Sequence, residues 1–264
     1  MDNNLLIETD TRGVATVTLN RPDVHNAFND SVIADLHTAY NTLGMDESVR
    51  VIVLTGAGKS FSAGADLNWM KRSATFTAAE NKEDAMRLSG MLAAIRNCPK
   101  PTLAFVNGAA FGGGVGLTAC CDIAVAMATG VFSLSEVKLG LTPATISPYV
   151  IAAIGERAAQ RYFLTGERFD GIEARRIGLV HEIAQTRDEA EMIIEGIIDQ
   201  LLSSGPVAQA ECKSLIQFVA GAEITDELRA ETAERIAARR TSAEGQEGLS
   251  AFFEKRKPSW SSEQ

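Results

Sequence analysis

Short β-branched runs alternate with amphipathic stretches along the first half of the chain. Val14–Leu19 and Val51–Thr55 are short apolar runs, which are typical of buried strands. Between them, apolar positions recur at helical spacing from Asn29 to Leu43, and Asn29 or Asp30 would cap that helix. This alternation predicts a core of mixed α and β elements.

The same pattern continues to about residue 146. The capping-box signature Thr77-x-x-Glu80 predicts a helix that runs towards Ile95 and is stopped by Pro99 and Pro101. Further strands are expected at Thr102–Val106, Ile123–Ala126, Val131–Leu134 and, as the last one, Leu179–Ile183.

After Ser147 the pattern is almost entirely helical. We expect helices at Tyr149–Ile154, Arg157–Leu164, Asp170–Ile177, Asp188–Leu202, Val207–Phe218, Thr225–Arg239 and Glu244–Glu254. The change of pattern predicts an α/β core over residues 1–200 and a helical C-terminal region over residues 201–264.

The segment from Pro101 to Ala128 is apolar enough to resemble a membrane span. It contains Asn107, Asp122 and three consecutive glycines, however, and a glycine run interrupts a helix. We therefore interpret it as strand, glycine turn, helix and strand, and expect no membrane association.

Composition and net charge argue against some classes of function. The 264 residues carry a formal net charge of −9, which argues against a nucleic-acid partner because phosphate binding needs a basic face. The four cysteines lack C-x-x-C spacing and the three histidines are scattered, so we expect no metal site. An N-terminus without a long apolar stretch and reduced cysteines favour the cytoplasm.

Three familiar site patterns fail on inspection. Gly56–Ser60 lacks the earlier glycine of a phosphate loop, because that position is Val53. Gly112–Gly116 does not satisfy G-x-G-x-x-G, since the third glycine would fall on Leu117. No G-x-S-x-G elbow surrounds the serines near these turns, which weakens a serine-hydrolase interpretation.

Two glycine-rich turns are the strongest candidates for chemistry. Phe61-Ser-Ala-Gly-Ala-Asp-Leu67 follows one predicted strand, and Gly108-Ala-Ala-Phe-Gly-Gly-Gly114 follows another and precedes a predicted helix. Glycine lets a ligand approach the backbone, and a helix N-terminus offers free N–H groups. The two turns could aim two N–H donors at one oxygen, as in an oxyanion hole. The alternative is that they only permit close strand–helix packing.

Several segments together resemble the enoyl-CoA hydratase/isomerase (crotonase) family over nearly the whole chain. The matching segments are Leu19-Asn-Arg-Pro22 with Asn26-Ala-Phe28, Phe61–Leu67, Asn107–Gly114, Cys121-Asp-Ile123, Phe132-Ser-Leu-Ser-Glu136 with Leu139-Gly-Leu141, and Ala251-Phe-Phe-Glu-Lys-Arg256. The resemblance implies an α/β fold with a crotonase-like core of repeated ββα units and C-terminal helices that build homotrimers or dimers of trimers. It also implies an acyl-CoA thioester as substrate, with no separate cofactor, since coenzyme A is part of the substrate.

The resemblance also assigns residues. By position, the oxyanion donors are the backbone N–H groups of Ala65 and Gly113, and the turns that hold them include Gly64 and Gly112. Ala63, Asp66 and Leu67 line the coenzyme A side of the site. Phe252 and Lys255 match positions that contact coenzyme A from a neighbouring subunit.

One departure from the family pattern bears on the reaction. Family hydratases commonly carry two glutamates; one matches Glu136, and the other matches position 116, which is glycine here. Hydration of a 2-enoyl-CoA with Glu136 as acid and base is the first hypothesis, supported by similarity to methylglutaconyl-CoA or related isoprenoid-type hydratases. Double-bond isomerisation, which needs one carboxylate, is the second. A non-catalytic or RNA-binding relative is a third, disfavoured by the charge and by the intact Glu136.

Overall fold

The computed structural model describes residues 4–261. A six-stranded sheet forms the centre of the body, with the strand order β1-β2-β3-β5-β7-β10. Its strands are β1 (Leu5–Thr9), β2 (Val14–Leu19), β3 (Val51–Gly56), β5 (Thr102–Val106), β7 (Ile123–Met127) and β10 (Glu182–Ala184). β1 pairs antiparallel with β2, and all other neighbours are parallel.

A second, four-stranded sheet has the order β4-β6-β8-β9. It consists of β4 (Ser60–Ser62), β6 (Ala109–Phe111), β8 (Val131–Ser133) and β9 (Arg168–Asp170). β4, β6 and β8 are parallel, and β9 is antiparallel to β8. Each of β3, β5 and β7 is followed within a few residues by one strand of this small sheet and then by a helix, so the core repeats a ββα unit.

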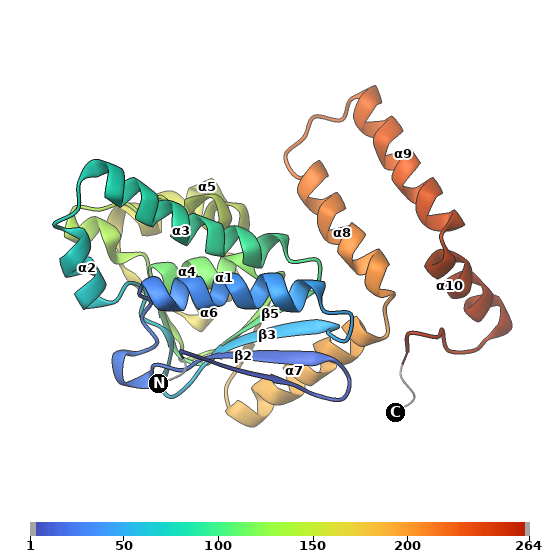
Figure 1. Ribbon diagram of the computed structural model, residues 1–264, viewed down its shortest axis with the longest axis horizontal. Coiled ribbons are helices and arrows are strands. Elements are labelled where there is room, and N and C mark those ends of the chain that lie inside the picture. The colour runs from blue at the N-terminus through green and yellow to red at the C-terminus, as the bar shows by residue number, and fades with distance from the viewer. Residues whose placement is uncertain (1–3, 262–264) are drawn as a thin grey trace.

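Helices cover both faces of the large sheet. α1 (Asp30–Met45), α3 (Ala78–Asn97) and α4 (Gly113–Cys120) lie on one side, and α7 (Arg187–Leu202) lies on the other (Figure 1). Strand residues alternate between the two layers: Ile52 and Leu54 join the core under α1 and α3, whereas Val51 and Val53 pack with the core that includes Ile194 of α7. Because helices cover both faces of these strands, the strands are apolar throughout their length.

The predicted helix boundaries depend on local hydrogen bonds that the structure contains. The Asn29 side chain accepts the Val32 N–H at 3.0 Å and caps α1, and Thr77 and Glu80 form both halves of a capping box on α3. The predicted helices Tyr149–Ile154 and Arg157–Leu164 form one element, α5 (Ser147–Thr165), which is broken at Gly155 by its φ of 72°. The interpretation of 101–128 as strand, turn, helix and strand is confirmed by β5, β6, α4 and β7.

One predicted strand is misplaced. Leu179–Ile183 was expected as the last strand, but β10 begins only at Glu182. Gly178 has a φ of 86°, and the Leu179 N–H bonds to the Ala174 carbonyl at 2.9 Å, so Leu179 closes helix α6 (Gly171–Arg176). The apolar Leu179 is buried as part of that helix end. No helix within residues 4–261 is both long and apolar enough to cross a bilayer.

The last three helices project from the body as an arm (Figure 1). They are α8 (Pro206–Val219), α9 (Asp226–Thr241) and α10 (Ala243–Glu254). The Arg50 guanidinium holds the root of the arm by donating to the carbonyls of Leu202, Ser204 and Trp260 at 3.0 to 3.3 Å. Further along α8, the Lys213 ammonium lies 2.6 Å from the Asp122 carboxylate and donates to the Lys100 carbonyl.

The Lys213–Asp122 pair predicts a measurable loss of stability on substitution. Lys213→Met should lower the free energy of unfolding by about 1–3 kcal/mol, because the pair is largely buried and Asp122 would keep its charge without its cation. Arg229→Met is the matched control, since the Arg229–Asp226 pair is exposed and should contribute less than about 0.5 kcal/mol. Denaturant unfolding at constant pH measures both, and equal effects would contradict the anchoring role.

Candidate active site

The carboxyl ends of three parallel strands converge at one edge of the small sheet. β4 ends at Ser62, β6 at Phe111 and β8 at Ser133, and each strand runs directly into a turn. Because the strands are parallel, the three turns meet at the same edge, which is where ligands commonly bind in α/β proteins. These turns carry Ala65, Gly113 and Glu136, so the structure brings the three sequence candidates together.

The first turn is fixed by hydrogen bonds to the segment before α1. The Ala63 N–H donates to the His25 carbonyl at 2.9 Å, the Phe28 N–H to the Gly64 carbonyl at 2.7 Å, and the Asp66 N–H to the Phe28 carbonyl at 2.8 Å. This ladder leaves the Ala65 N–H without an acceptor among residues 4–261. Ala65 is also exposed, so its N–H is available to a ligand.

The second turn requires glycine for steric reasons. Gly112 has a φ of 49°, and a Cβ on Gly113 would overlap the ring of Phe28. Gly113 is the first residue of α4, where an N–H has no partner within the helix, and none is found elsewhere in the described chain. A Cβ on Gly64 would lie 3.3 Å from the Gly113 nitrogen, which shows how closely the two turns approach each other.

Glu136 belongs to the third turn, in the 3₁₀ segment η2 (Ser135–Leu139). Its carboxylate lies over Gly112, because a Cβ there would stand 2.9 Å from Oε1. The other oxygen, Oε2, is buried and has no hydrogen-bond partner in the described residues. Burial raises the pKa of Glu136 above its usual value, against a smaller lowering by its own backbone N–H. A carboxylate that is poorly solvated and unpaired is well suited to take up a proton.

Asp66 has a structural part in the same turn. Its carboxylate caps α2 (Leu67–Ser73) by accepting the N–H groups of Asn68 and Trp69, and it accepts a hydrogen bond from Arg21 at 3.0 Å. Burial alone would raise the pKa of Asp66, but these hydrogen bonds outweigh it and hold the pKa below the usual value. Asp66 is therefore a charged cap that fixes the residue next to Ala65.

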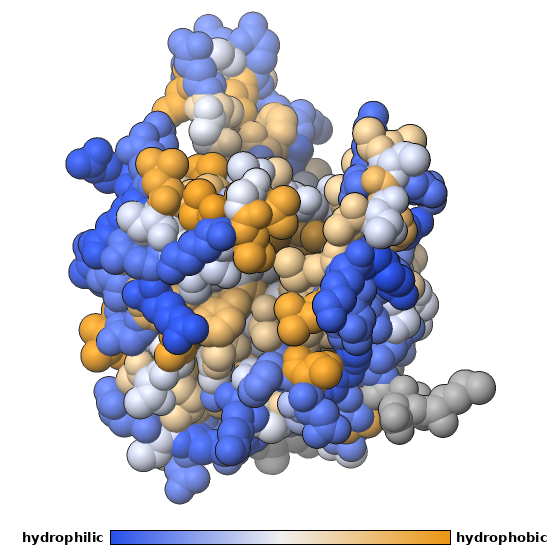
Figure 2. All heavy atoms as spheres, turned by 90° about the vertical axis from the view of Figure 1, so that its left-hand side faces the viewer, coloured by the Kyte–Doolittle hydropathy of each residue, from blue (hydrophilic) through white to orange (hydrophobic). Residues whose placement is uncertain are grey.

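The remaining sequence candidates lie in two different places. Leu67 opens α2 and is largely exposed, beside the first turn. Figure 2 views the end of the body on which α2 lies in Figure 1, and apolar side chains gather in the middle of that face between hydrophilic ones. Phe252 and Lys255 lie at the end of α10, on the arm, and a single chain does not bring them to Glu136. The described residues contain no cluster of histidine, cysteine and carboxylate side chains that could hold a metal.

Phe28 is a residue whose role the sequence did not reveal. Its backbone pairs with the first turn, while its ring fills the space beside Gly113 in the second. Phe28 thus sets the separation of the two turns. The only sequence signal was its place in Asn26-Ala-Phe28, next to Asn26, whose buried side chain donates to the carbonyls of Ala57 and Ser60.

The packing around position 116 explains why a glycine stands there. Gly116 is buried in α4, and a Cβ there would overlap the side chain of Ile146. Ile146 is itself almost fully buried. The space in which a second carboxylate would begin is therefore filled by an apolar side chain, and Glu136 has no acidic partner at that position.

Comparison with known proteins identifies the family and the fold. Residues 9–263 match the family model described as enoyl-CoA hydratase/isomerase. An enoyl-CoA hydratase from Shewanella pealeana is 44% identical with a TM-score of 0.95, covering 98% of this chain and 96% of that one. AtuE of Pseudomonas aeruginosa is 36% identical with a TM-score of 0.94, and its whole length is covered by 98% of this chain.

A third structure, an enoyl-CoA hydratase from Mycobacterium smegmatis, is 33% identical with a TM-score of 0.92, covering 98% of this chain and 100% of that one. Together these matches define the class of protein, namely enzymes that act on acyl-CoA thioesters. The chain belongs to the enoyl-CoA hydratase/isomerase family, which confirms the predicted crotonase-like ββα core and helical C-terminal region.

The fit of Ile146 against Gly116 predicts a specific coupling between the two positions. Gly116→Glu should destabilise the protein by about 2–4 kcal/mol, because the new side chain overlaps Ile146 and buries a charge. Gly116→Glu combined with Ile146→Ala should recover at least about 1 kcal/mol of that loss. Thermal unfolding of both single variants and the double variant measures the coupling, and strictly additive effects would show that the side chains do not compete for one space.

Proposed function

We propose that this protein hydrates the double bond of a 2-enoyl-CoA thioester, with Glu136 as both acid and base. The observation that carries the proposal is the unpaired, partly buried carboxylate of Glu136 beside two turns with free N–H groups. Membership of the family supports hydratase activity in general.

In the proposed reaction, the Ala65 and Gly113 N–H groups bind the thioester oxygen. Glu136 takes a proton from water as the water oxygen bonds to C3, and the electron pair of the double bond moves through C2 to the thioester oxygen. The resulting enolate is stabilised by both N–H donors. The protonated Glu136 then delivers the proton to C2, which regenerates the carboxylate and leaves a 3-hydroxyacyl-CoA. A single group can serve both carbons when addition occurs on one face.

Isomerisation is the second candidate, and Ile146 is the observation that favours it. With the space at Gly116 filled, only one carboxylate is available to the substrate from these two family positions. In that reaction Glu136 would take a proton from C2 of a 3-enoyl-CoA, and the dienolate would regain it at C4. Incubation with 2-enoyl-CoA and 3-enoyl-CoA thioesters distinguishes the two, since hydration adds the mass of water and isomerisation leaves the mass unchanged.

Replacement of Glu136 should separate activity from stability. Glu136→Gln should lower kcat by about 10²–10⁴-fold while leaving acyl-CoA binding nearly unchanged, because the amide keeps the shape and loses the base. Wild-type kcat should also fall as the pH drops through the raised pKa of Glu136, since the base must be ionised. A variant with near-wild-type turnover would remove Glu136 from the mechanism.

The same variant should be more stable than the wild type at neutral pH, by about 1 kcal/mol. The pKa of Glu136 is higher in the folded than in the unfolded protein, so rising pH ionises the unfolded state first and lowers wild-type stability. Below the usual value of 4.5 the carboxyl is protonated in both states and the difference should vanish. Thermal unfolding at pH 4 and pH 7 measures this change.

A finer proposal concerns the acyl group. A branched 3-methylglutaconyl-like substrate would bring a second carboxylate that needs a cation, and the sequence candidates are Lys71, Arg72 and Lys138. Arg72 already pairs with Asp30. Lys71 and Lys138 have no ion pair among the described residues, so either is free to act as the counter-charge.

Lys71→Met or Lys138→Met should therefore raise KM for the carboxylated substrate by roughly tenfold or more, the loss expected for a charged hydrogen bond. KM for an uncarboxylated enoyl-CoA is the control and should stay constant. Equal changes for both substrates, or no change in either variant, would remove the support for a dicarboxylate.

The proposal also includes the oligomeric state of the protein. The arm exposes large apolar side chains, including Phe252 and Phe253, each about three-quarters accessible in the single chain. Such exposure supports burial against neighbouring copies in a homotrimer or a dimer of trimers, in which Phe252 and Lys255 would reach the coenzyme A of another subunit. The mass of the assembly in solution tests this arrangement.

A cytoplasmic location remains a prediction from the sequence.

A further inference from the structure

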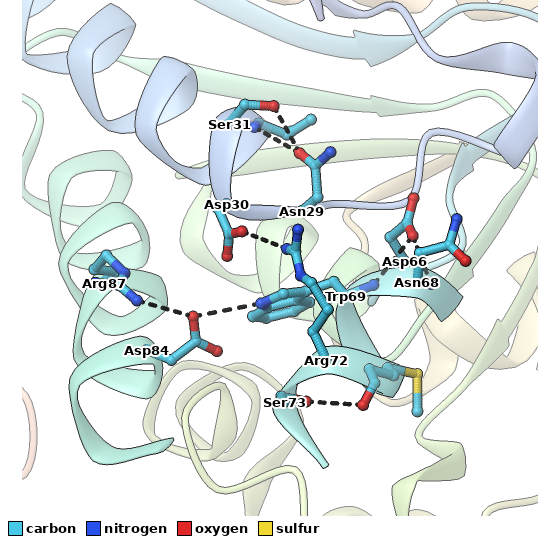
Figure 3. Close-up of polar contacts among 12 residues, drawn as sticks. Asn29, Asp30, Ser31, Asp66, Asn68, Trp69, Arg72, Ser73, Asp84 and Arg87 are labelled. Carbon is cyan, nitrogen blue, oxygen red and sulfur yellow. Dashed lines mark hydrogen bonds and ion pairs between the residues drawn. The ribbon is translucent and has the colours of Figure 1, made fainter. Parts of the chain in front are cut away.

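The short helix α2 follows directly on the turn that carries Ala65. Its first turn is held by the Asp66 cap, and the side chains of Trp69 and Arg72 extend from it towards α3 and α1 (Figure 3). Within the chain, Asp66 joins the two parts: its backbone neighbours Ala65, and its carboxylate accepts the N–H of Trp69 at 3.3 Å. Asp66 therefore links α2 to the turn of Ala65, which the hydrogen bonds to Phe28 also hold.

Two side-chain contacts fix α2 from outside. The indole N–H of Trp69 donates to the Asp84 carboxylate of α3 at 3.4 Å, and Arg72 pairs with Asp30 of α1 (Figure 3). The Arg72–Asp30 pair is about half exposed on both sides, so it contributes little rigidity. Trp69 and Asp84 are both buried, so their contact is screened by solvent less than the Arg72–Asp30 pair.

Asp84 is a buried carboxylate with two partners, the Trp69 indole and the Arg87 guanidinium. It lies within α3, away from its N-terminus, where a carboxylate does not serve as a cap. Its other partner is the half-exposed Arg87 on the same helix, whose guanidinium lies 3.3 Å from the Asp84 carboxylate. Burial of a carboxylate costs free energy, and an apolar side chain would usually be at least as stable there. An apolar residue at position 84 would leave the indole N–H of Trp69 without this acceptor.

We propose that Asp84 is a positioning residue that acts through Trp69 to hold α2, and thereby keeps the Ala65 N–H aimed at the substrate oxygen. The inference rests on the proposed role of Ala65 as an oxyanion donor. An oxyanion donor acts mainly in the transition state, so a poorly aimed one lowers kcat more than it raises KM. A purely structural Asp84 would instead change stability and leave kcat per folded molecule unaltered.

The test compares Asp84→Leu, Asp84→Asn and Trp69→Phe in the full-length protein. Asp84→Leu and Trp69→Phe should each lower kcat about tenfold with KM within twofold, and the double variant should be no worse than the poorer single variant. Asp84→Asn should retain most of the activity, since its amide oxygen still accepts the indole N–H. Glu83→Gln is the matched control on the neighbouring exposed position and should behave as wild type.

Hydrogen exchange without substrate gives a second readout that does not depend on the reaction. The amides of Leu67–Ser73 should exchange faster in Asp84→Leu than in the wild type and in Asp84→Asn. Unchanged kcat in Asp84→Leu, or an equal loss in Asp84→Asn, overturns the positioning role even if exchange is faster. Glu136→Gln is measured alongside: if it retains full turnover, the proposed reaction fails, whereas its loss beside an active Asp84→Leu refutes only the inference about Asp84.

Discussion

The site depends on the close approach of two backbone turns at one edge of the small parallel sheet. β4 and β6 run side by side into these turns, and the ring of Phe28 occupies the space that any side chain at position 113 would need. Phe28 pairs with the residues on both sides of Ala65, since its N–H donates to the Gly64 carbonyl and its carbonyl accepts the Asp66 N–H, and the Ala65 N–H between them stays free. The N–H donors are therefore presented by the course of the chain, and side chains are needed only to fix that course.

Glu136 illustrates the conflict between stability and chemistry in such a site. A buried oxygen without a hydrogen-bond partner is unfavourable for folding, yet the same lack of solvation makes the carboxylate a better base. Ile146 fills the space beside Gly116 of α4 with an apolar side chain. Stability that the surroundings of Glu136 do not supply has to come from the core, and the two apolar layers on the large sheet provide it.

The sequence predicted the long elements well, because their signals are local. The caps at Asn29 and Thr77 and the buried run Thr102–Val106 lie where they were expected. The strands β4, β6 and β9 were missed because three residues carry no periodicity, and each is defined by its pairing within the small sheet. The first strand, β1, was also missed; it is mostly exposed and pairs at an edge of the large sheet. For the site, the glycine turns and Glu136 were visible in the sequence, whereas the parts of Phe28, Ile146 and Asp84 depend on contacts between distant segments.

The attachment of the arm has a consequence for how the chain can diverge. Arg50 holds the residues around the α7–α8 junction and the tail through their main-chain carbonyls alone. Every amino acid at those positions offers the same carbonyl, so the joint places little demand on their identity. Side chains along the junction can therefore change without the loss of these three hydrogen bonds, so this part of the attachment leaves the surface of the arm free to vary.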